Sequence, residues 1–143
     1  MTQMNGGTAI VEALRAAGVS HVFGLLGSST MELYDALYDA PDIKYVGVRD
    51  ERAGTHMADA YARVSGRPGV VLAGQAGPGV TNGISAVTTA HFNGSPLVVL
   101  GGRAPQARWG AGSLQEFDHV PVLKPITKDA RTLKDVNKIA HEV

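Results

Sequence analysis

Apolar residues are arranged in two different patterns along the chain, and the two patterns alternate from the N-terminus to the C-terminus. Short continuous apolar runs bounded by Gly, Pro or Asp are typical of strands buried on both faces, whereas apolar residues repeated every three to four positions are typical of helices. The first pattern predicts strands at 19–26, 43–48, 69–73 and 96–101. The second predicts helices at 8–17, 31–38, 51–64, 80–92 and 132–143.

Glycine and hydroxyl residues mark the ends of the predicted helices. Gly18 and Gly66 follow the last apolar positions of their helices, where a glycine in the left-handed conformation commonly ends a helix. A Ser or Thr within 28–30 is expected to cap the helix at 31–38, and Thr132 is expected to cap the last helix. In the helix at 51–64 the positions with core spacing are Ala53, Met57, Ala60 and Tyr61.

Strands that alternate with helices of about ten or more residues predict a mainly parallel sheet covered by helices on both faces. We therefore expect one three-layer α/β/α domain over residues 1–143. Ligands of such folds bind outside the carboxyl ends of the strands. Glu51, the segment 77–82 and the loop after Gly101 all follow predicted strands, so we expect them to meet at one rim of the sheet.

The composition of the chain argues against several classes of binding partner. The formal net charge is zero, with 13 basic and 13 acidic residues interspersed, which gives no electrostatic indication of nucleic acid or of an anionic membrane surface. The sequence has no Cys, no His pair with spacing typical of metal ligands, and no apolar run near the ~20 residues of a membrane helix. We therefore expect a soluble cytoplasmic protein without a metal site of its own.

Glu51 opens a predicted helix just after a predicted strand. Taken alone, a Glu in the first turn is explained by its favourable interaction with the helix dipole. The sequence continues, however, with Met57-Ala58 and Tyr61-Ala62-Arg63, and after the next strand with Gly77-Pro78-Gly79 and Asn82. This order resembles the pyrimidine-binding (PYR) domain of thiamine-diphosphate enzymes.

The resemblance implies a coenzyme site on this chain. In the family, the carboxyl group that Glu51 matches is catalytic: it hydrogen-bonds the aminopyrimidine ring of thiamine diphosphate and favours the tautomer that removes the C2 proton of the thiazolium. The residues that match the family positions around the coenzyme are Gly27, Gly77, Pro78, Gly79 and Asn82. Glycines at such positions let the backbone approach a flat ligand closely.

The chain departs from the family pattern in ways that leave the branch of the family open. The family usually has His before the glutamate, whereas this chain has Asp50. Asp50 is either a second carboxylate that acts on Glu51 or an exposed N-cap. Leu26 stands where the family often has Pro, and Ala76 where it often has Ser or Thr.

A later segment, Gln115-Glu116-Phe117-Asp118, resembles the acetolactate-synthase branch and the nearby 2-hydroxyacyl-CoA lyases. The resemblance implies that Gln115 lies near the reacting centre and orients the substrate. It also suggests that Ser28 and Lys128 line the substrate channel. Without the resemblance, these residues would be interpreted as surface residues. His91 and His119 are the histidines expected near the same rim, and neither is assigned a role.

Family enzymes bind the diphosphate and Mg²⁺ through a second domain marked by Gly-Asp-Gly, and this sequence contains no Gly-Asp-Gly. We therefore expect a PYR domain that is incomplete at its C-terminus and inactive alone, with the central and diphosphate-binding domains absent. The complete enzyme is expected to be a homodimer or homotetramer. It would form or cleave a carbon–carbon bond next to a carbonyl of a 2-oxo acid or 2-hydroxyacyl-CoA.

Several alternatives remain beside an acetolactate-synthase-like enzyme. Within the superfamily, they are a 2-hydroxyacyl-CoA lyase and a 2-oxo acid decarboxylase. Outside it, they are a non-catalytic α/β domain that binds a partner and a flavodoxin-like nucleotide-binding domain. A dinucleotide site is disfavoured because the turn at 24–28 does not have the Gly-x-Gly-x-x-Gly spacing.

Overall fold

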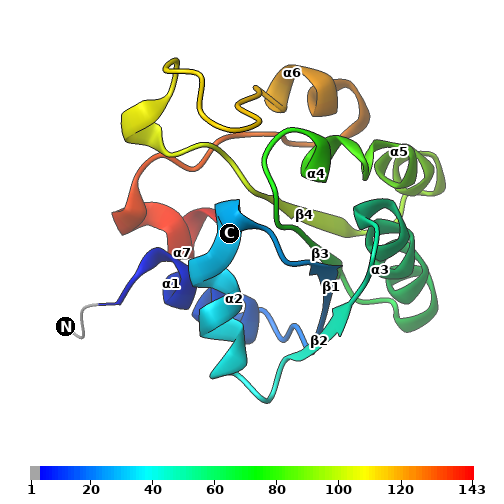
Figure 1. The fold of residues 1–143 in the computed structure, drawn as a ribbon. Helices are drawn as coiled ribbons and strands as arrows, with labels where there is room; N and C mark the ends of the chain where they lie inside the picture. The colour runs from blue at the N-terminus through cyan, green and yellow to red at the C-terminus, as the bar shows by residue number, and fades with distance from the viewer. Residues whose placement is uncertain (1–3) are drawn as a thin grey trace.

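A computed structural model describes residues 4–143 and contains one four-stranded sheet. The strands pair in the order β2-β1-β3-β4, and every pairing is parallel (Figure 1). Their bounds are β1 His21–Leu25, β2 Lys44–Gly47, β3 Gly69–Ala73 and β4 Leu97–Gly101. The parallel sheet predicted from the apolar runs is confirmed, and β3 has the predicted bounds.

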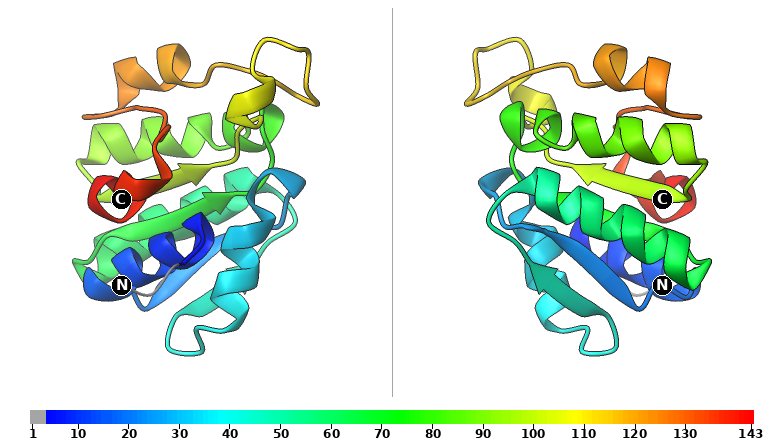
Figure 2. Two further views of the ribbon diagram at one scale, coloured as in Figure 1. Left: turned by 90° about the vertical axis from the view of Figure 1, so that its left-hand side faces the viewer. Right: turned by 90° about the vertical axis from the view of Figure 1, so that its right-hand side faces the viewer.

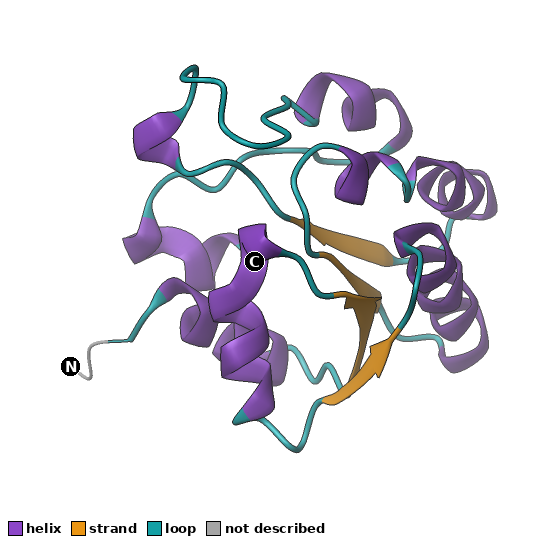
Figure 3. Cartoon of the chain, in the orientation of Figure 1, coloured by secondary structure: helices purple, strands orange, loops and turns teal. Residues whose placement is uncertain are grey.

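Helices cover both faces of this sheet, which confirms the three-layer α/β/α architecture (Figures 1 and 3). The α-helices are α1 Gly6–Ala16, α2 Met31–Tyr38, α3 Glu51–Ser65, α4 Pro78–Thr81, α5 Ile84–Asn93, α6 Val120–Leu123 and α7 Ile139–Glu142. Figure 2 shows α1 and α2 on one side of the sheet and α3 and α5 on the other. None of the helices in residues 4–143 is long and apolar enough to cross a membrane.

The core is divided between the two faces by the alternation of side chains along the central strands. Val22 of β1 pairs with Val70 of β3, and both pack with α1 and α2 in the larger cluster, which also contains Leu72. The next pair along, Phe23 and Val71, points to the opposite face and packs with α3. Because successive side chains of a strand alternate between faces, this register buries both faces of β1 and β3.

Local chemistry sets several helix ends, and the end predicted at Gly66 is confirmed. Gly66 ends α3 with φ 69° and Gly94 ends α5 with φ 63°, both in the left-handed region that favours glycine. At the other end of α3, Asp50 is the N-cap, and its side chain accepts a hydrogen bond of 2.8 Å from the Arg52 amide. Asp50 is therefore a partly exposed cap, which confirms one of the two interpretations left open by the sequence.

The buried face of α3 differs from the predicted one. Ala53, Met57 and Ala60 are exposed, with Met57 41% accessible. Tyr61 is only partly buried, although it does pack against the cluster around Phe23. The buried positions are instead Glu51, Gly54, Thr55, Ala58, Asp59 and Ala62. These side chains are mostly small or polar, so the helix approaches the sheet and α5 closely without an apolar stripe that the sequence would reveal.

Other predicted helices also need correction. The helix predicted at 80–92 is broken at Asn82 and Gly83 into α4 and α5. The long helix predicted at 132–143 is only α7, preceded by a 3₁₀ turn at 136–138 and with no cap from Thr132. No hydroxyl of residues 28–30 caps α2; Thr30 Oγ1 instead donates to the Gly74 carbonyl at 3.0 Å. That bond ties the start of α2 to the end of β3.

Candidate active site

The segments predicted to meet at one rim of the sheet do so. Glu51 begins α3 after β2, the Gly77-Pro78-Gly79 turn follows β3, and the loop at 102–119 follows β4 (Figure 1). All three lie at the carboxyl ends of parallel strands, where ligands of open α/β sheets bind. The rim therefore brings together the segments in which most of the predicted site residues lie, and Glu51 is buried there.

The Glu51 side chain is held in a defined orientation. Glu51 as a whole is only 6% exposed to solvent. Oε2 accepts a hydrogen bond of 3.0 Å from Asn82 Nδ2, so the predicted site residues Glu51 and Asn82 are in direct contact. Among residues 4–143, no hydrogen-bond donor reaches Oε1. The carboxyl group is thus fixed through one oxygen and has the other available to a ligand.

A glycine surface lies beside the available oxygen. A Cβ placed on Gly79 would lie 3.3 Å from Glu51 Oε1 and 2.9 Å from Gln75 Cβ. A side chain there would therefore crowd the carboxyl group, whereas glycine leaves room for a flat group against the backbone. Gly77 precedes it with φ 60° and ψ −112°, a conformation that side chains other than glycine rarely adopt.

Gly27 contributes to the rim by close backbone packing. A Cβ on Gly27 would lie 2.3 Å from the carbonyl carbon of Gly74, so only glycine fits between the ends of β1 and β3. The neighbouring Ser28 hydroxyl donates a hydrogen bond of 2.8 Å to Gln75 Oε1. The structure thus places Ser28 beside Gln75, which itself lies against Gly79.

The loop after β4 covers the beginning of the Gly77 turn. The Gly77 amide donates a hydrogen bond of 2.9 Å to His119 Nε2. A Cβ on Gly77 would lie 2.8 Å from the carbonyl oxygen of Gln115, so the backbone of the same loop packs on this glycine. Gln115 is a non-glycine residue with positive φ, 54°, and its exposed side chain makes no hydrogen bond within residues 4–143. Gln115 therefore belongs to the site through its backbone.

His119 has an environment that favours the neutral ring. Burial lowers the pKa of His119 below its ordinary value of 6.5, and the positive charge of Arg103 acts in the same direction, while the negative charge of Asp118 opposes it. The hydrogen bond from the Gly77 amide requires an unprotonated Nε2, so the geometry also favours the neutral imidazole. His119 was expected near the rim, but no sequence pattern predicted its contact with Gly77.

Lys128 is not brought to the other predicted site residues by any contact in the part of the chain described. It is exposed and follows the 3₁₀ turn at 124–126. The same part of the chain, residues 4–143, contains no group of three or more His, Cys, Asp or Glu side chains that could hold a metal ion.

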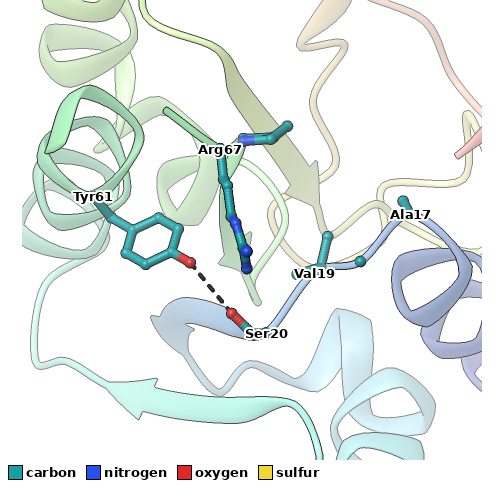
Figure 4. A pocket seen from close by; sticks show the side chains of 7 residues that line it. Ala17, Val19, Ser20, Tyr61 and Arg67 are labelled. Atoms are coloured by element: carbon teal, nitrogen blue, oxygen red, sulfur yellow. Dashed lines mark hydrogen bonds between the residues drawn. The ribbon is translucent and has the colours of Figure 1, made fainter. Parts of the chain in front are cut away.

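A cavity of about 320 Å³ lies at the other end of the sheet, bordered by residues 17–20, Tyr61 and Arg67 (Figure 4). Ser20 Oγ and Tyr61 Oη form a hydrogen bond of 3.2 Å on its wall. The C-terminal ends of α1 and α3 lie beside it, and their dipoles disfavour an anion there. This cavity is separate from the Glu51 rim and adds nothing to that site.

Comparison with known proteins identifies the domain. Residues 4–122 match the family described as "Thiamine pyrophosphate enzyme, N-terminal TPP binding domain". The chain belongs to this family. It is an N-terminal domain of the acetolactate-synthase-like type, because its relatives include several acetolactate synthase large subunits.

An acetolactate synthase large subunit of Mycobacterium tuberculosis is 45% identical over 129 residues, which cover 90% of this chain and 23% of that protein. The isozyme 3 large subunit of Escherichia coli is 39% identical over 139 residues, covering 97% of this chain and 24% of that protein. A probable large subunit of Methanocaldococcus jannaschii is 39% identical over 136 residues, covering 95% and 23%. The chain thus spans about a quarter of the length of these relatives.

The residues at the rim fit one part of thiamine pyrophosphate (thiamine diphosphate). The family coenzyme has a flat aminopyrimidine ring with a nitrogen that a carboxyl group can hydrogen-bond. Glu51 presents a buried carboxyl oxygen with no donor from residues 4–143, and Gly79 leaves a surface without a side chain beside it. For Mg²⁺, the described residues contain no cluster of His, Cys, Asp or Glu side chains that could hold the ion. Glu51, Gly79 and Asn82 therefore fit the pyrimidine half.

Proposed function

We propose that this chain supplies the coenzyme-activating half of a thiamine-diphosphate active site, with Glu51 as its catalytic residue. The observation that carries the proposal is the state of the Glu51 carboxyl group. It is buried, fixed by Asn82 through Oε2, and open at Oε1 beside Gly79. The helix dipole alone does not account for this burial, because its interaction with a first-turn carboxylate contributes at most about 2 kcal/mol, whereas removing a charged carboxyl group from water costs more unless the group is paired.

In this proposal each residue of the rim has a physical task. Glu51 Oε1 holds a proton towards the ring nitrogen of the pyrimidine, where the low exposure of the site strengthens the hydrogen bond. Asn82 prevents the carboxyl group from rotating. Gly77, Pro78, Gly79 and Gly27 shape the backbone that the ring lies against. When bound, the coenzyme would supply the nucleophilic carbon for the reaction at the substrate carbonyl.

The proposed reaction forms or cleaves a carbon–carbon bond next to a carbonyl, as in an acetolactate-synthase-like enzyme that uses 2-oxo acids. The similarity to acetolactate synthase large subunits supports this class. Gln115 and Ser28 lie on the loops around the rim and are proposed to line the substrate channel, together with Lys128. We further propose that Mg²⁺ and the diphosphate are held by another domain and that the enzyme works as a homodimer or homotetramer.

The experiment is replacement of Glu51 by Gln in the complete enzyme that contains this chain. Gln keeps the size and the hydrogen bond but cannot exchange a proton, so kcat is expected to fall by about 10² to 10⁴. Asp50→Asn is the matched control, since it removes a carboxylate one residue away and retains a good N-cap. Equal activity of the Glu51→Gln variant and the wild type would refute the role of Glu51. Equal losses in both variants would mean that general electrostatics, not proton exchange at Glu51, controls the rate.

A further inference from the structure

The loop after β4 is connected to the catalytic carboxylate by an unbroken series of contacts. His119 Nε2 accepts the Gly77 amide at 2.9 Å, and Gly77 is the N-cap of α4. Two residues further on, Gly79 lies against Glu51 Oε1. Asn82, at the end of α4, donates to Glu51 Oε2. The turn that shapes the coenzyme surface is therefore held at its beginning by His119 and at its end by Glu51.

From this series we infer that His119 is a positioning residue, which fixes the Gly77-Pro78-Gly79 turn against Glu51 by accepting the Gly77 amide. The inference rests on the function proposed for Glu51. It adds a residue that has no direct part in the chemistry, because His119 acts through Gly77 and Gly79 rather than on the coenzyme itself.

The geometry of Gly77 explains why an acceptor is needed there. Gly77 lies beyond the end of β3 at Ala73, so its amide has no partner in the sheet, and residues 4–143 offer this amide no acceptor other than His119. The ring is oriented in turn by Phe117, whose centroid lies 5.4 Å from it in an edge-to-face arrangement. Without His119 the Gly77 amide would be unpaired, and this strained residue would be held only through its carbonyl, which accepts from the Val80 and Thr81 amides.

The Gln115 backbone holds the same glycine from a second direction. Its carbonyl oxygen lies against the α-carbon of Gly77, where a Cβ would come within 2.8 Å. Gln115 itself has φ 54°, so the covering loop turns sharply at this contact. Two residues of one loop therefore fix one glycine, and only the His119 contact uses a side chain that can be exchanged without changing the backbone.

A pair of variants isolates the hydrogen bond from the volume of the ring. Gln at position 119 can place Oε1 where Nε2 lies and accept the Gly77 amide. Met has a similar length and flexibility but ends in a methyl group at that position. His119→Gln is therefore the rescuing variant and His119→Met the disrupting one. Thermal unfolding of both variants shows whether either has lost the fold.

The first measurement is amide hydrogen exchange at Gly77 in the chain itself, which does not depend on catalysis. The Gly77 amide is expected to be protected in the wild type and in His119→Gln, and to exchange about tenfold faster in His119→Met. Equal exchange in the wild type and His119→Met would overturn the inference, because the hydrogen bond would then not restrain the amide. This result stands whether or not Glu51 activates the coenzyme.

The second measurement is steady-state kinetics of the same variants in the complete enzyme. His119→Met is expected to lower kcat about threefold to tenfold with a smaller change in KM for the 2-oxo acid, because the turn is displaced from Glu51 while the side chains proposed to line the substrate channel are unchanged. His119→Gln is expected to retain kcat within about twofold. Losses of equal size in both variants would refute the role of the acceptor. A fully active Glu51→Gln enzyme would instead refute the proposed function, and the exchange data would show whether the hydrogen bond itself is real.

Discussion

Replacing Gly79 by Ala tests whether the glycine surface beside Glu51 is needed for function. The added Cβ would lie 2.9 Å from Gln75 Cβ and 3.3 Å from Glu51 Oε1. Carbon atoms in favourable contact are about 3.5–4.0 Å apart, so Gln75 or the turn must move by about 0.6 Å or more. The movement displaces the carboxyl group, and the new methyl group occupies the surface proposed for the pyrimidine ring.

The magnitude follows from two separate effects. Overpacking of this kind destabilises the fold by about 1–3 kcal/mol, which corresponds to a decrease of about 3–10 °C in the melting temperature of the chain. The effect on catalysis is larger, because displacement of catalytic groups by about 1 Å can cost about 10²-fold in rate. We therefore expect Gly79→Ala to lose about 10²-fold in thiamine-diphosphate-dependent kcat/KM.

Gly83→Ala is the matched control for this experiment. A Cβ on Gly83 would lie 2.9 Å from Thr55 Oγ1, a clash of similar size a few residues further along the chain and not against Glu51 Oε1. Melting curves of the chain and kcat/KM of the complete enzyme are measured for both variants. If Gly79→Ala remained within about twofold of the wild type, or if both variants lost the same activity, the glycine surface would have no specific role.

Two further predictions concern the ends of the site. Asp50→Ala removes the N-cap of α3 and should lower the free energy of unfolding, measured in urea, by about 1 kcal/mol, whereas Asp50→Asn should be nearly neutral. Equal stability of the wild type and both variants would contradict the capping role. The pKa of His119 is lowered by burial, so as the pH falls through about 6.5 the unfolded chain takes up a proton before the folded one. The stability that His119 contributes is therefore present above its ordinary pKa and is lost as the pH falls towards its folded value. Urea unfolding between pH 7.5 and 5.5 should show a steeper decline for the wild type than for His119→Gln, and parallel declines would refute this.

The parts of the fold that could be predicted from the sequence are those set by local chemistry. The continuous apolar run Gly69–Ala73 has only one stable environment, a strand buried on both faces, and β3 has these bounds. Gly66 ends α3 because a glycine tolerates the left-handed conformation, and Asp50 begins the helix because its carboxylate can accept a backbone amide. Each of these signals acts over a few residues and needs no knowledge of the rest of the chain.

The buried face of α3 could not be predicted because it is selected by close approach and not by apolar surface. A Cβ on Gly69 would lie 2.0 Å from the Ala58 carbonyl oxygen, and a Cβ on Gly83 would crowd Thr55. Small residues therefore face the sheet and α5, while the larger Met57 points outward. A rule based on hydrophobic spacing places Met57 inside, since it takes side-chain size as a measure of burial.

The meeting of Glu51 with the segment 77–82 was predictable because parallel topology brings the carboxyl ends of strands together. The individual bonds were not. Asn82 is 31 residues from Glu51, and His119 is 42 residues from Gly77. Such contacts depend on the helix break at Asn82 and on the course of the loop after β4, and neither leaves a periodic pattern in the sequence.

The glycines at the strand ends explain how a rim built from separate loops keeps its geometry. At the ends of β1 and β3, a Cβ on Gly74 would lie 2.3 Å from the Leu25 carbonyl oxygen, and a Cβ on Gly27 would lie 2.3 Å from the Gly74 carbonyl carbon. After β4, a Cβ on Gly102 would lie 2.8 Å from the Gly74 carbonyl oxygen. The ends of β1, β3 and β4 are therefore packed backbone against backbone, which fixes the distances between the loops that follow them. Backbone contacts of this kind have no rotamers to exchange, so the Gly77 turn and the loops after β1 and β4 are held in register by the sheet itself. In this domain glycine at the strand ends serves rigidity: any side chain at these positions would separate the loops after β1, β3 and β4, and with them the Gly77 turn that is proposed to face the coenzyme.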